Sequence, residues 1–298
     1  MGSERFTARE WLPIDVMPHS HRRAAGDASV GCPELVDAPS FCMLRRRNGR
    51  DWWQRQAWPA VGEVHVWTCA LDATGGAGEA LSVMATCLTD DEMRRASRYA
   101  TPLLRERCLR ARSWLRHVLG AYLGCAPAAV PLQTGPHGKP YLAEEGLAFN
   151  LAHSDARAVL VVGVGYGLGV DVEELRAIPE AAAMAGRWFS RAEVRWIAAS
   201  DDGDRAFLRC WVCHEAVHKA VGAGFSIPPD AVTLTPPPRP VVTAHVAGQR
   251  VLVAELPVSP RCVAALAVAV GNGARVRAVS PEAGIALRNE GVEFFPVD

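Results

Sequence analysis

The sequence contains the same order of elements twice, an amphipathic helical region followed by short apolar strands. The strands expected at 157–165 and 261–271 have similar sequences: each starts at an arginine, runs through valine, alanine and leucine, and ends at a glycine. Apolar runs of this length are too short to span a bilayer as a helix and fit buried strands. The repeat predicts an α+β fold of two pseudo-symmetric α+β subdomains, each a helix pair followed by antiparallel strands.

Helix starts are marked by capping residues. Thr89 and Ser190 are each followed three residues later by glutamate, which is the capping-box arrangement. Apolar residues recur at intervals of three or four over 102–123, which predicts a long helix with one buried face. A second long helix is expected at about 205–221 and should end at the glycine that follows.

These elements divide the chain into an N-terminal extension (1–61), an N-terminal α+β subdomain (62–165), a C-terminal α+β subdomain (166–280) and a tail (281–298). Besides the strand at 169–173, the expected strands are 64–67, 130–133, 147–151, 159–164, 232–234, 241–246, 251–256 and 263–270.

Composition argues against several classes of protein. The formal net charge is zero and no polybasic block occurs, so we expect neither a nucleic-acid nor a membrane partner. The start of the chain is charged and lacks an apolar signal segment, which predicts a cytoplasmic protein. Of nine cysteines, only Cys210 and Cys213 have CxxC spacing, inside a helical pattern. Free thiols are therefore favoured over a metal or redox pair.

Two carboxylates alternate along one predicted strand, Gly-Val-Asp-Val-Glu at 169–173. Alternate residues of a strand share a face, so Asp171 and Glu173 should project together, opposite the core-facing valines. Side by side, two carboxylates repel unless a proton or a cation joins them, and oxygen ligands of this kind suit Mg²⁺. A solvated acidic strand end is the competing interpretation.

The predicted helix at 205–221 carries Glu215 and Lys219 one turn apart. Such a pair is commonly an ordinary surface pair, but Trp211 lies on the same stripe and indicates a cleft wall. Of 32 lysines and arginines, only Lys139 and Lys219 are lysines, which hints that a compact, movable ammonium matters at both places.

Other candidate sites are weaker. His153 follows a predicted strand and, taken alone, is more often a surface or packed residue than a ligand. The glycine-rich segment at 135–140 is not a P-loop, because Gln133 and Pro140 stand at positions that the motif reserves for glycine and for serine or threonine. The segment 163–169 does not fit the dinucleotide-binding glycine pattern in any register.

Four motifs occur together in one order and spacing: Gly-Lys-Pro at 138–140, Asn-Leu-Ala-His-Ser at 150–154, Gly-Val-Asp-Val-Glu at 169–173, and the Trp-to-Gly helix segment at 211–222. In this respect the chain resembles the surfactin-type (Sfp-type) 4′-phosphopantetheinyl transferases over about residues 62–280. That family has two pseudo-symmetric α+β halves in one polypeptide.

The resemblance implies a Mg²⁺-dependent enzyme that transfers phosphopantetheine from coenzyme A to a serine of an acyl or peptidyl carrier protein, releasing adenosine 3′,5′-bisphosphate. Asp171, Glu173 and Glu215 would hold the metal, Lys219 would contact the diphosphate, and Glu215 would be the catalytic base. The further positions implied for coenzyme A are Arg95, Arg107, Gly138, Lys139, Pro140 and His153. Polyketide and nonribosomal peptide synthases are the usual partners of this branch, and a monomer is expected.

Two residues depart from the family pattern. His214 stands where lysine is usual, so a fixed charge becomes one that depends on pH, and activity is expected to vary more with pH than is usual in the family. Ala152 replaces the usual serine or threonine and removes one hydroxyl. Two alternatives stay open: a non-catalytic module that binds coenzyme A or carrier protein, and a different Mg²⁺-dependent enzyme that cleaves a pyrophosphate.

Overall fold

The structure is a computed structural model that describes residues 57–60, 63–72, 86–135, 138–143, 146–222, 232, 234, 241–246, 249–270, 277–280, 285–289 and 292–296. Its elements are β1 (Glu63–Ala70), α2 (Asp90–Ala96), α3 (Pro102–Leu123), η1 (Pro127–Ala129), β2 (Leu132–Thr134), β3 (Pro140–Leu142), β4 (Leu147–Ser154), β5 (Arg157–Val164), β6 (Gly167–Glu174), α4 (Ala181–Trp188), α5 (Arg191–Ala198), α6 (Gly203–Val221), β7 (Val241–Val246), β8 (Gln249–Glu255), β9 (Cys262–Val270), β10 (Arg277–Ser280), β11 (Ile285–Asn289) and β12 (Val292–Pro296).

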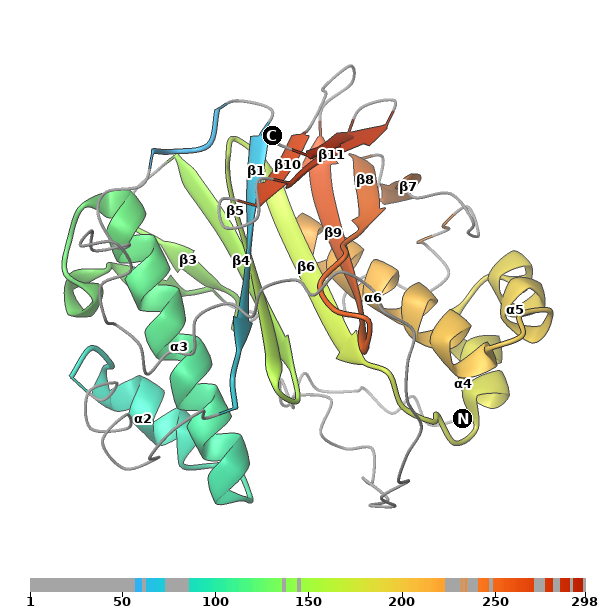
Figure 1. The fold of residues 1–298 in the computed structure, drawn as a ribbon, viewed down its shortest axis with the longest axis horizontal. Helices are drawn as coiled ribbons and strands as arrows, with labels where there is room; N and C mark the ends of the chain where they lie inside the picture. Colours follow the sequence, from blue (N-terminus) through green and yellow to red (C-terminus); the bar gives the residue numbers. More distant parts are fainter. Residues whose placement is uncertain are drawn as a thin grey trace, which may run out of the picture.

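Two sheets form the centre of the molecule, with α3 outside the first and α6 outside the second (Figure 1). The first sheet has the strand order β12-β11-β10-β1-β5-β4, and the second has the order β6-β9-β8-β7. The segments β1-β5-β4 and β6-β9-β8 correspond: each half begins with a strand that later pairs antiparallel with the last strand of a hairpin. The predicted α+β fold with two similar halves is therefore confirmed.

Strand alternation explains how one strand serves two cores. On β5, Leu160 and Val162 pack with the apolar face of α3, whereas Val159 and Val161 belong to a core between the two sheets. Strand β9 does the same on the other side, since Leu266 joins the core between the sheets while its neighbours pack under α6. A strand buried on both faces is apolar at nearly every position, which is why these two segments are uniform in sequence.

The predicted helix signals are present in the structure. Thr89 and Ser190 both form complete capping boxes at the starts of α2 and α5. Helix α3 ends at Gly124, which has a left-handed backbone (φ 68°), and α6 ends at Gly222 in the same way (φ 70°). Helix α6 begins slightly earlier than predicted, at Gly203, because the side chain of Asp202 caps it.

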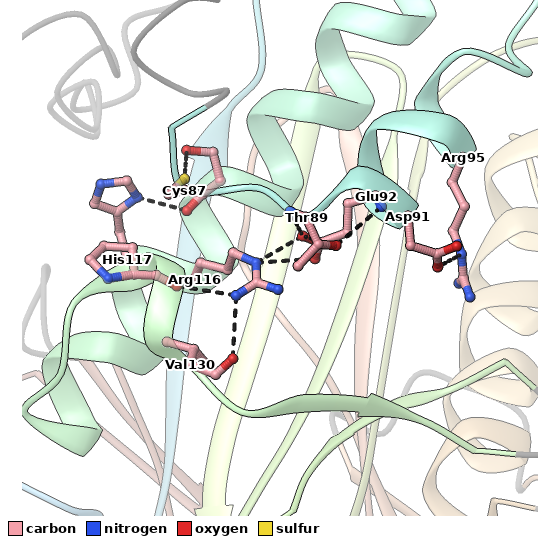
Figure 2. Close-up of polar contacts among 10 residues, drawn as sticks. Cys87, Thr89, Asp91, Glu92, Arg95, Arg116, His117 and Val130 are labelled. Carbon is pink, nitrogen blue, oxygen red and sulfur yellow. Dashed lines mark hydrogen bonds and ion pairs between the residues drawn. The ribbon is translucent and has the colours of Figure 1, made fainter.

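A buried ion pair attaches α2 to α3 (Figure 2). The Nε atom of Arg116 donates to Glu92 Oε2 over 2.9 Å, and its Nη1 atom donates to the carbonyl of Val130 over 3.3 Å. Glu92 also accepts the backbone N–H of Thr89 as part of the capping box. The same carboxylate therefore stabilises the positive N-terminal end of the α2 dipole and neutralises the buried guanidinium of Arg116.

Several predicted boundaries need correction. Residues 127–129 form a short 3₁₀ turn, so the strand expected at 130–133 begins only at Leu132, and β3 was not predicted. Residues 232 and 234 are buried but are not in a strand. The expected tail contains β11 and β12, which extend the first sheet. Residues 277–280, which belong to the expected C-terminal subdomain but carry no predicted strand, form β10, and this strand pairs in parallel with β1 of the N-terminal subdomain.

Parts of the expected extension fall outside the described residues, which begin at 57. Trp58, within the expected extension, contacts the first half: its Nε1 donates to the carbonyl of Tyr122 over 3.0 Å. The cysteines that the structure describes are free, including the CxxC pair on α6, both of which are buried. No helix in the described part of the chain has the length and apolar character needed to cross a membrane.

Helix α6 lies directly on β6, and glycine permits this contact. A Cβ atom at Gly169 would lie 2.0 Å from the carbonyl oxygen of Ala216 and 2.5 Å from the backbone nitrogen of Ala220. Both are main-chain atoms, which cannot move without displacing the helix. The helix and strand backbones are consequently close enough for short polar contacts between their side chains.

We expect Gly169→Ala to destabilise the protein by about 3 kcal/mol, because one methyl group would force α6 away from β6. Gly186→Ala is the matched control, since its Cβ on α4 would meet nothing within 4 Å, and alanine should be neutral or favourable there by about 0.5–1 kcal/mol. Urea unfolding of both variants measures this difference. Equal midpoints for the two variants would contradict the close contact.

Candidate active site

Asp171 and Lys219 form a buried ion pair between β6 and α6. The ammonium of Lys219 donates to Asp171 Oδ1 over 2.6 Å and to the carbonyl of Val170 over 3.2 Å. Asp171 and Glu173 lie on the face of β6 opposite Val170 and Val172, as predicted. That face is covered, since Asp171 and Glu173 are each 5% exposed, so the solvated strand end is excluded.

The pKa values of Asp171 and Lys219 are shifted by burial and by neighbouring charged groups. Burial raises the pKa of Asp171, and the charges of Glu173 and Glu215 raise it further, while Lys219 opposes them. Burial would lower the pKa of Lys219, but the charges of Asp171 and Glu215 outweigh it and raise this pKa. The ammonium therefore stays protonated, and Asp171 depends on it to remain ionised.

Glu215 lies on α6 one turn before Lys219. Burial alone would raise its pKa, but His218 and the charge of Lys219 together hold the pKa of this carboxyl below its ordinary value. Its Oε1 atom is 3.9 Å from His218 Nδ1. Among the described residues, neither ring nitrogen of His218 nor Nε1 of Trp211 has a hydrogen-bond partner, although all three atoms are buried. The stripe of Trp211, Glu215 and His218 thus carries polar groups that the described residues do not satisfy.

Glu173 does not join the other two carboxylates. Its Oε2 atom accepts from Nη1 of Arg176 over 2.7 Å and from Oγ of Ser154 over 3.0 Å. Within the residues that the structure describes, no three aspartate, glutamate, histidine or cysteine side chains are close enough together to hold a metal ion. The three predicted metal ligands lie in one region but are not assembled as a triad.

A divalent cation nevertheless fits part of this donor set. Asp171 Oδ2 is buried and accepts no hydrogen bond from the described residues, although Oδ1 is paired. An unpaired carboxylate oxygen in a strongly negative surrounding is a hard ligand of the kind that Mg²⁺ prefers. Asp171 thus offers one unpaired oxygen to a metal, and the charge of Glu215 acts on the same carboxyl, whereas Glu173 would have to leave Arg176.

The residues predicted to contact phosphates lie in different surroundings. Lys139 is half-buried, and its ammonium donates to the carbonyls of Leu168 (2.8 Å) and Lys219 (2.6 Å). Gly138 precedes it with a left-handed backbone (φ 80°), and Pro140 begins β3. The Gly-Lys-Pro segment therefore reaches the same α6–β6 contact that carries the carboxylates.

Three other predicted residues of the first half, Arg95, Arg107 and His153, lie in different surroundings. Arg107 is 10% exposed and pairs with Asp72 (2.8 Å) and with Asp155, the turn residue between β4 and β5. His153 is exposed at the end of β4. Arg95 lies on the surface of α2 and pairs with Asp91 over 3.1 Å (Figure 2). Arg95 and Arg107 are thus paired with carboxylates of the first half, and His153 precedes Ser154, which bonds to β6.

His214 contacts α5 rather than the carboxylates of β6. Its Nε2 atom lies 2.7 Å from Glu193 Oε1, and its ring packs on Phe189 at 5.0 Å between centroids. Burial alone would raise the pKa of Glu193, but the hydrogen bond and charge of His214 hold it below the ordinary value. The predicted pH dependence of activity stays a prediction, but the charge concerned belongs to a buried pair.

Two residues of the second motif have contacts that sequence reasoning missed. Asn150 Oδ1 accepts the backbone N–H of Val170 over 2.7 Å, and Ser154 Oγ accepts that of Glu174 over 3.3 Å. Both residues lie on β4 and reach across to β6. The available signal was a polar residue at a buried position, since Asn150 is 4% exposed inside a strand.

Comparison with known proteins agrees with this arrangement. The profile of the 4′-phosphopantetheinyl transferase superfamily matches residues 167–262, the segment from β6 to the start of β9. The 4′-phosphopantetheinyl transferase HetI of Nostoc sp. is 35% identical over 213 residues, which is 70% of this chain and 88% of HetI. The chain belongs to the 4′-phosphopantetheinyl transferase superfamily.

More distant relatives extend the comparison. The L-aminoadipate-semialdehyde dehydrogenase-phosphopantetheinyl transferase of Schizosaccharomyces pombe is 26% identical over 170 residues, covering 50% of this chain and 64% of that protein. The crystal structure of the Thermotoga maritima holo-[acyl-carrier-protein] synthase aligns with a TM-score of 0.31 at 21% identity, over 44% of this chain and 83% of that one. The chain itself is therefore a phosphopantetheinyl transferase, an enzyme whose partners are coenzyme A and carrier proteins.

The Asp171→Asn variant tests the electrostatics of the transferase site. A native carboxyl with a raised pKa binds a proton that the unfolded chain releases, so its contribution to stability falls as pH rises above about 4. The asparagine side chain does not titrate, so its contribution to stability does not fall as the pH rises. The stability of Asp171→Asn relative to the unmodified protein should therefore increase from about pH 4 towards neutrality. Urea unfolding across this range measures it, and a flat or falling difference would contradict the raised pKa.

The His214–Glu193 pair makes a separate prediction. His214→Ala should lower the free energy of unfolding by about 3 kcal/mol, because it leaves a buried carboxylate without its partner. Adding Glu193→Gln in the same chain should recover part of this loss, since a neutral amide needs no counter-charge. Chemical denaturation of His214→Ala, of Glu193→Gln and of the double variant measures the coupling energy of the pair. Additive effects of the two substitutions would show that the pair is not coupled.

Proposed function

We propose that this transferase moves the 4′-phosphopantetheine group of coenzyme A onto a carrier-protein serine in a Mg²⁺-dependent reaction. The observation that carries the proposal is the buried Asp171–Lys219 pair, in which Asp171 Oδ2 lacks a partner among the described residues. The pair brings together a carboxylate oxygen that could bind a metal and the ammonium of Lys219. Phosphoryl transfer depends mainly on positioning and on neutralised charge, which is what these groups supply.

The reaction assigns a role to each residue, and two roles to Glu215. The serine oxygen attacks the β-phosphorus of coenzyme A, and the bond from this phosphorus to the bridging oxygen breaks, so that adenosine 3′,5′-bisphosphate leaves. Glu215 accepts the serine proton, for which its lowered pKa keeps it ionised. The Lys219 ammonium stabilises the charge that develops on the leaving phosphate. Mg²⁺, held by Asp171 and Glu215, would neutralise the diphosphate.

A second candidate function has one observation in its favour. Arg176 and Ser154 occupy the carboxylate of Glu173, so the third expected ligand is already paired. A module that binds coenzyme A or carrier protein without turnover would tolerate such a pairing. The buried Lys219 ammonium argues for the transferase, because a binding module has no evident need for a cation beside an unpaired carboxylate oxygen.

The biological setting is also a proposal. We expect carrier proteins of polyketide or nonribosomal peptide synthases as acceptors and a cytoplasmic monomer as the working unit. Side chains of both halves of one chain meet at β6, which supports a site completed within a single molecule.

Mass spectrometry of an apo carrier protein incubated with this protein, coenzyme A and Mg²⁺ tests the proposal. We expect a gain of about 340 Da, the mass of one phosphopantetheine, that is lost with EDTA and with Glu215→Gln. Arg94→Met, which changes an exposed pair on α2, is the control and should keep the activity. No gain with several unrelated carriers, from protein that still binds coenzyme A, would favour the binding module.

A further inference from the structure

Strand β6 pairs with none of the described strands along one of its two edges. It pairs with β9 along one side, and it is the outermost strand of its sheet on the other side. Because alternate residues of a strand direct their backbone groups to opposite edges, the groups of residues 168, 170 and 174 share the outer edge. Side chains of the first half bond to them, since Asn150 accepts from Val170 and Ser154 accepts from Glu174.

Lys139 supplies the third of these contacts and one more. Its ammonium donates to the carbonyl of Leu168 on this edge over 2.8 Å, and to the carbonyl of Lys219 over 2.6 Å. Lys219 lies in the last turn of α6, which ends at Val221, so its carbonyl has no N–H four residues on within the helix. A cation at this end also opposes the negative end of the helix dipole.

We propose that Lys139 is a positioning residue, which holds the C-terminal turn of α6 against β6 and thereby keeps Lys219 directed at Asp171. This inference rests on the proposed function, because it gives Lys139 a role in the transfer through Lys219. The two carbonyl contacts use the ammonium that a phosphate would otherwise bind. The Gly-Lys-Pro motif of the first half therefore contributes to the second half as a structural bridge.

The chemistry of lysine suits this place. Burial, together with the nearby charge of Lys219, lowers the pKa of Lys139 to about 8. A compact ammonium has three donors and can bond two carbonyls at different angles, whereas a guanidinium is planar and larger. The backbone of Lys139 is also held in place, since its carbonyl accepts the N–H of Gly135 over 2.9 Å.

Hydrogen exchange on the substrate-free protein is the first test, and it needs no activity. In Lys139→Met, peptides that cover 168–174 and 216–222 should exchange about tenfold faster, because each loses a hydrogen bond to its main chain. Peptides of α3 should not change, and Arg94→Met should leave all of them unchanged. Unaltered exchange in both segments of a folded Lys139→Met would overturn the bridge.

Kinetics then separate a positioning residue from a phosphate ligand. If Lys139 acts through Lys219, Lys139→Met should lower kcat about tenfold with a small change in the KM for coenzyme A, and should cost nothing more in a Lys219→Met background. A phosphate ligand would instead raise KM, and its effect would add to that of Lys219→Met. Such additive behaviour would overturn the proposal.

Lys139→Arg covers the case in which Lys139→Met does not fold. It keeps the charge but changes the geometry, so the bridge predicts faster exchange at the end of α6 and a lowered kcat, whereas a phosphate ligand predicts normal values of both. If the unmodified protein transfers no phosphopantetheine at all, the proposed function fails. The exchange experiment would still decide whether Lys139 holds α6 to β6.

Discussion

The direct contact of the α6 backbone with the β6 backbone is the constraint on which the rest of the site depends. Glycine at 169 allows it, and the consequence is that Asp171 and Lys219 face each other across a distance too short for water to separate their charges. A buried ion pair costs desolvation energy and is stable only where the remaining donors and acceptors are satisfied. Lys219 meets this condition through the carbonyl of Val170, while one oxygen of Asp171 does not. This oxygen, Asp171 Oδ2, is the atom of the site to which a cation would bind.

The duplicated architecture explains why residues of the first half serve the second. Two open sheets meet with β4 and β6 as their outer strands on the same side, and the exposed backbone edge of β6 must find partners. Asn150, Ser154 and Lys139 provide them as side chains. These residues of the Gly-Lys-Pro and Asn-Leu-Ala-His-Ser motifs are thus explained by the hydrogen bonds that they form with the main chain of β6.

Local signals in the sequence were sufficient for much of this fold. The capping boxes at Thr89 and Ser190 depend on residues three apart, and the shared face of Asp171 and Glu173 depends only on strand alternation. The partners of charged side chains were not predictable, because Arg176 captures Glu173 and Glu193 captures His214 through geometry set by packing. Strand β10 was missed because its pairing with β1 is non-local. Strands β11 and β12, which lie in the expected tail, extend the same sheet from β10 by antiparallel pairing.

Helix α6 is held on two sides, and this decides which of its polar residues stays available. Lys219 is attached to β6 through Asp171, and His214 is attached to α5 through Glu193. Successive helix positions are about 100° apart, so Glu215 points between these two anchors and is held by neither strand nor helix. His218 lies 3.9 Å from it on the same helix, and the charge of Lys219 also acts on it. An ionised carboxylate that is only weakly bonded to the described residues is suited to accept a proton from an incoming hydroxyl.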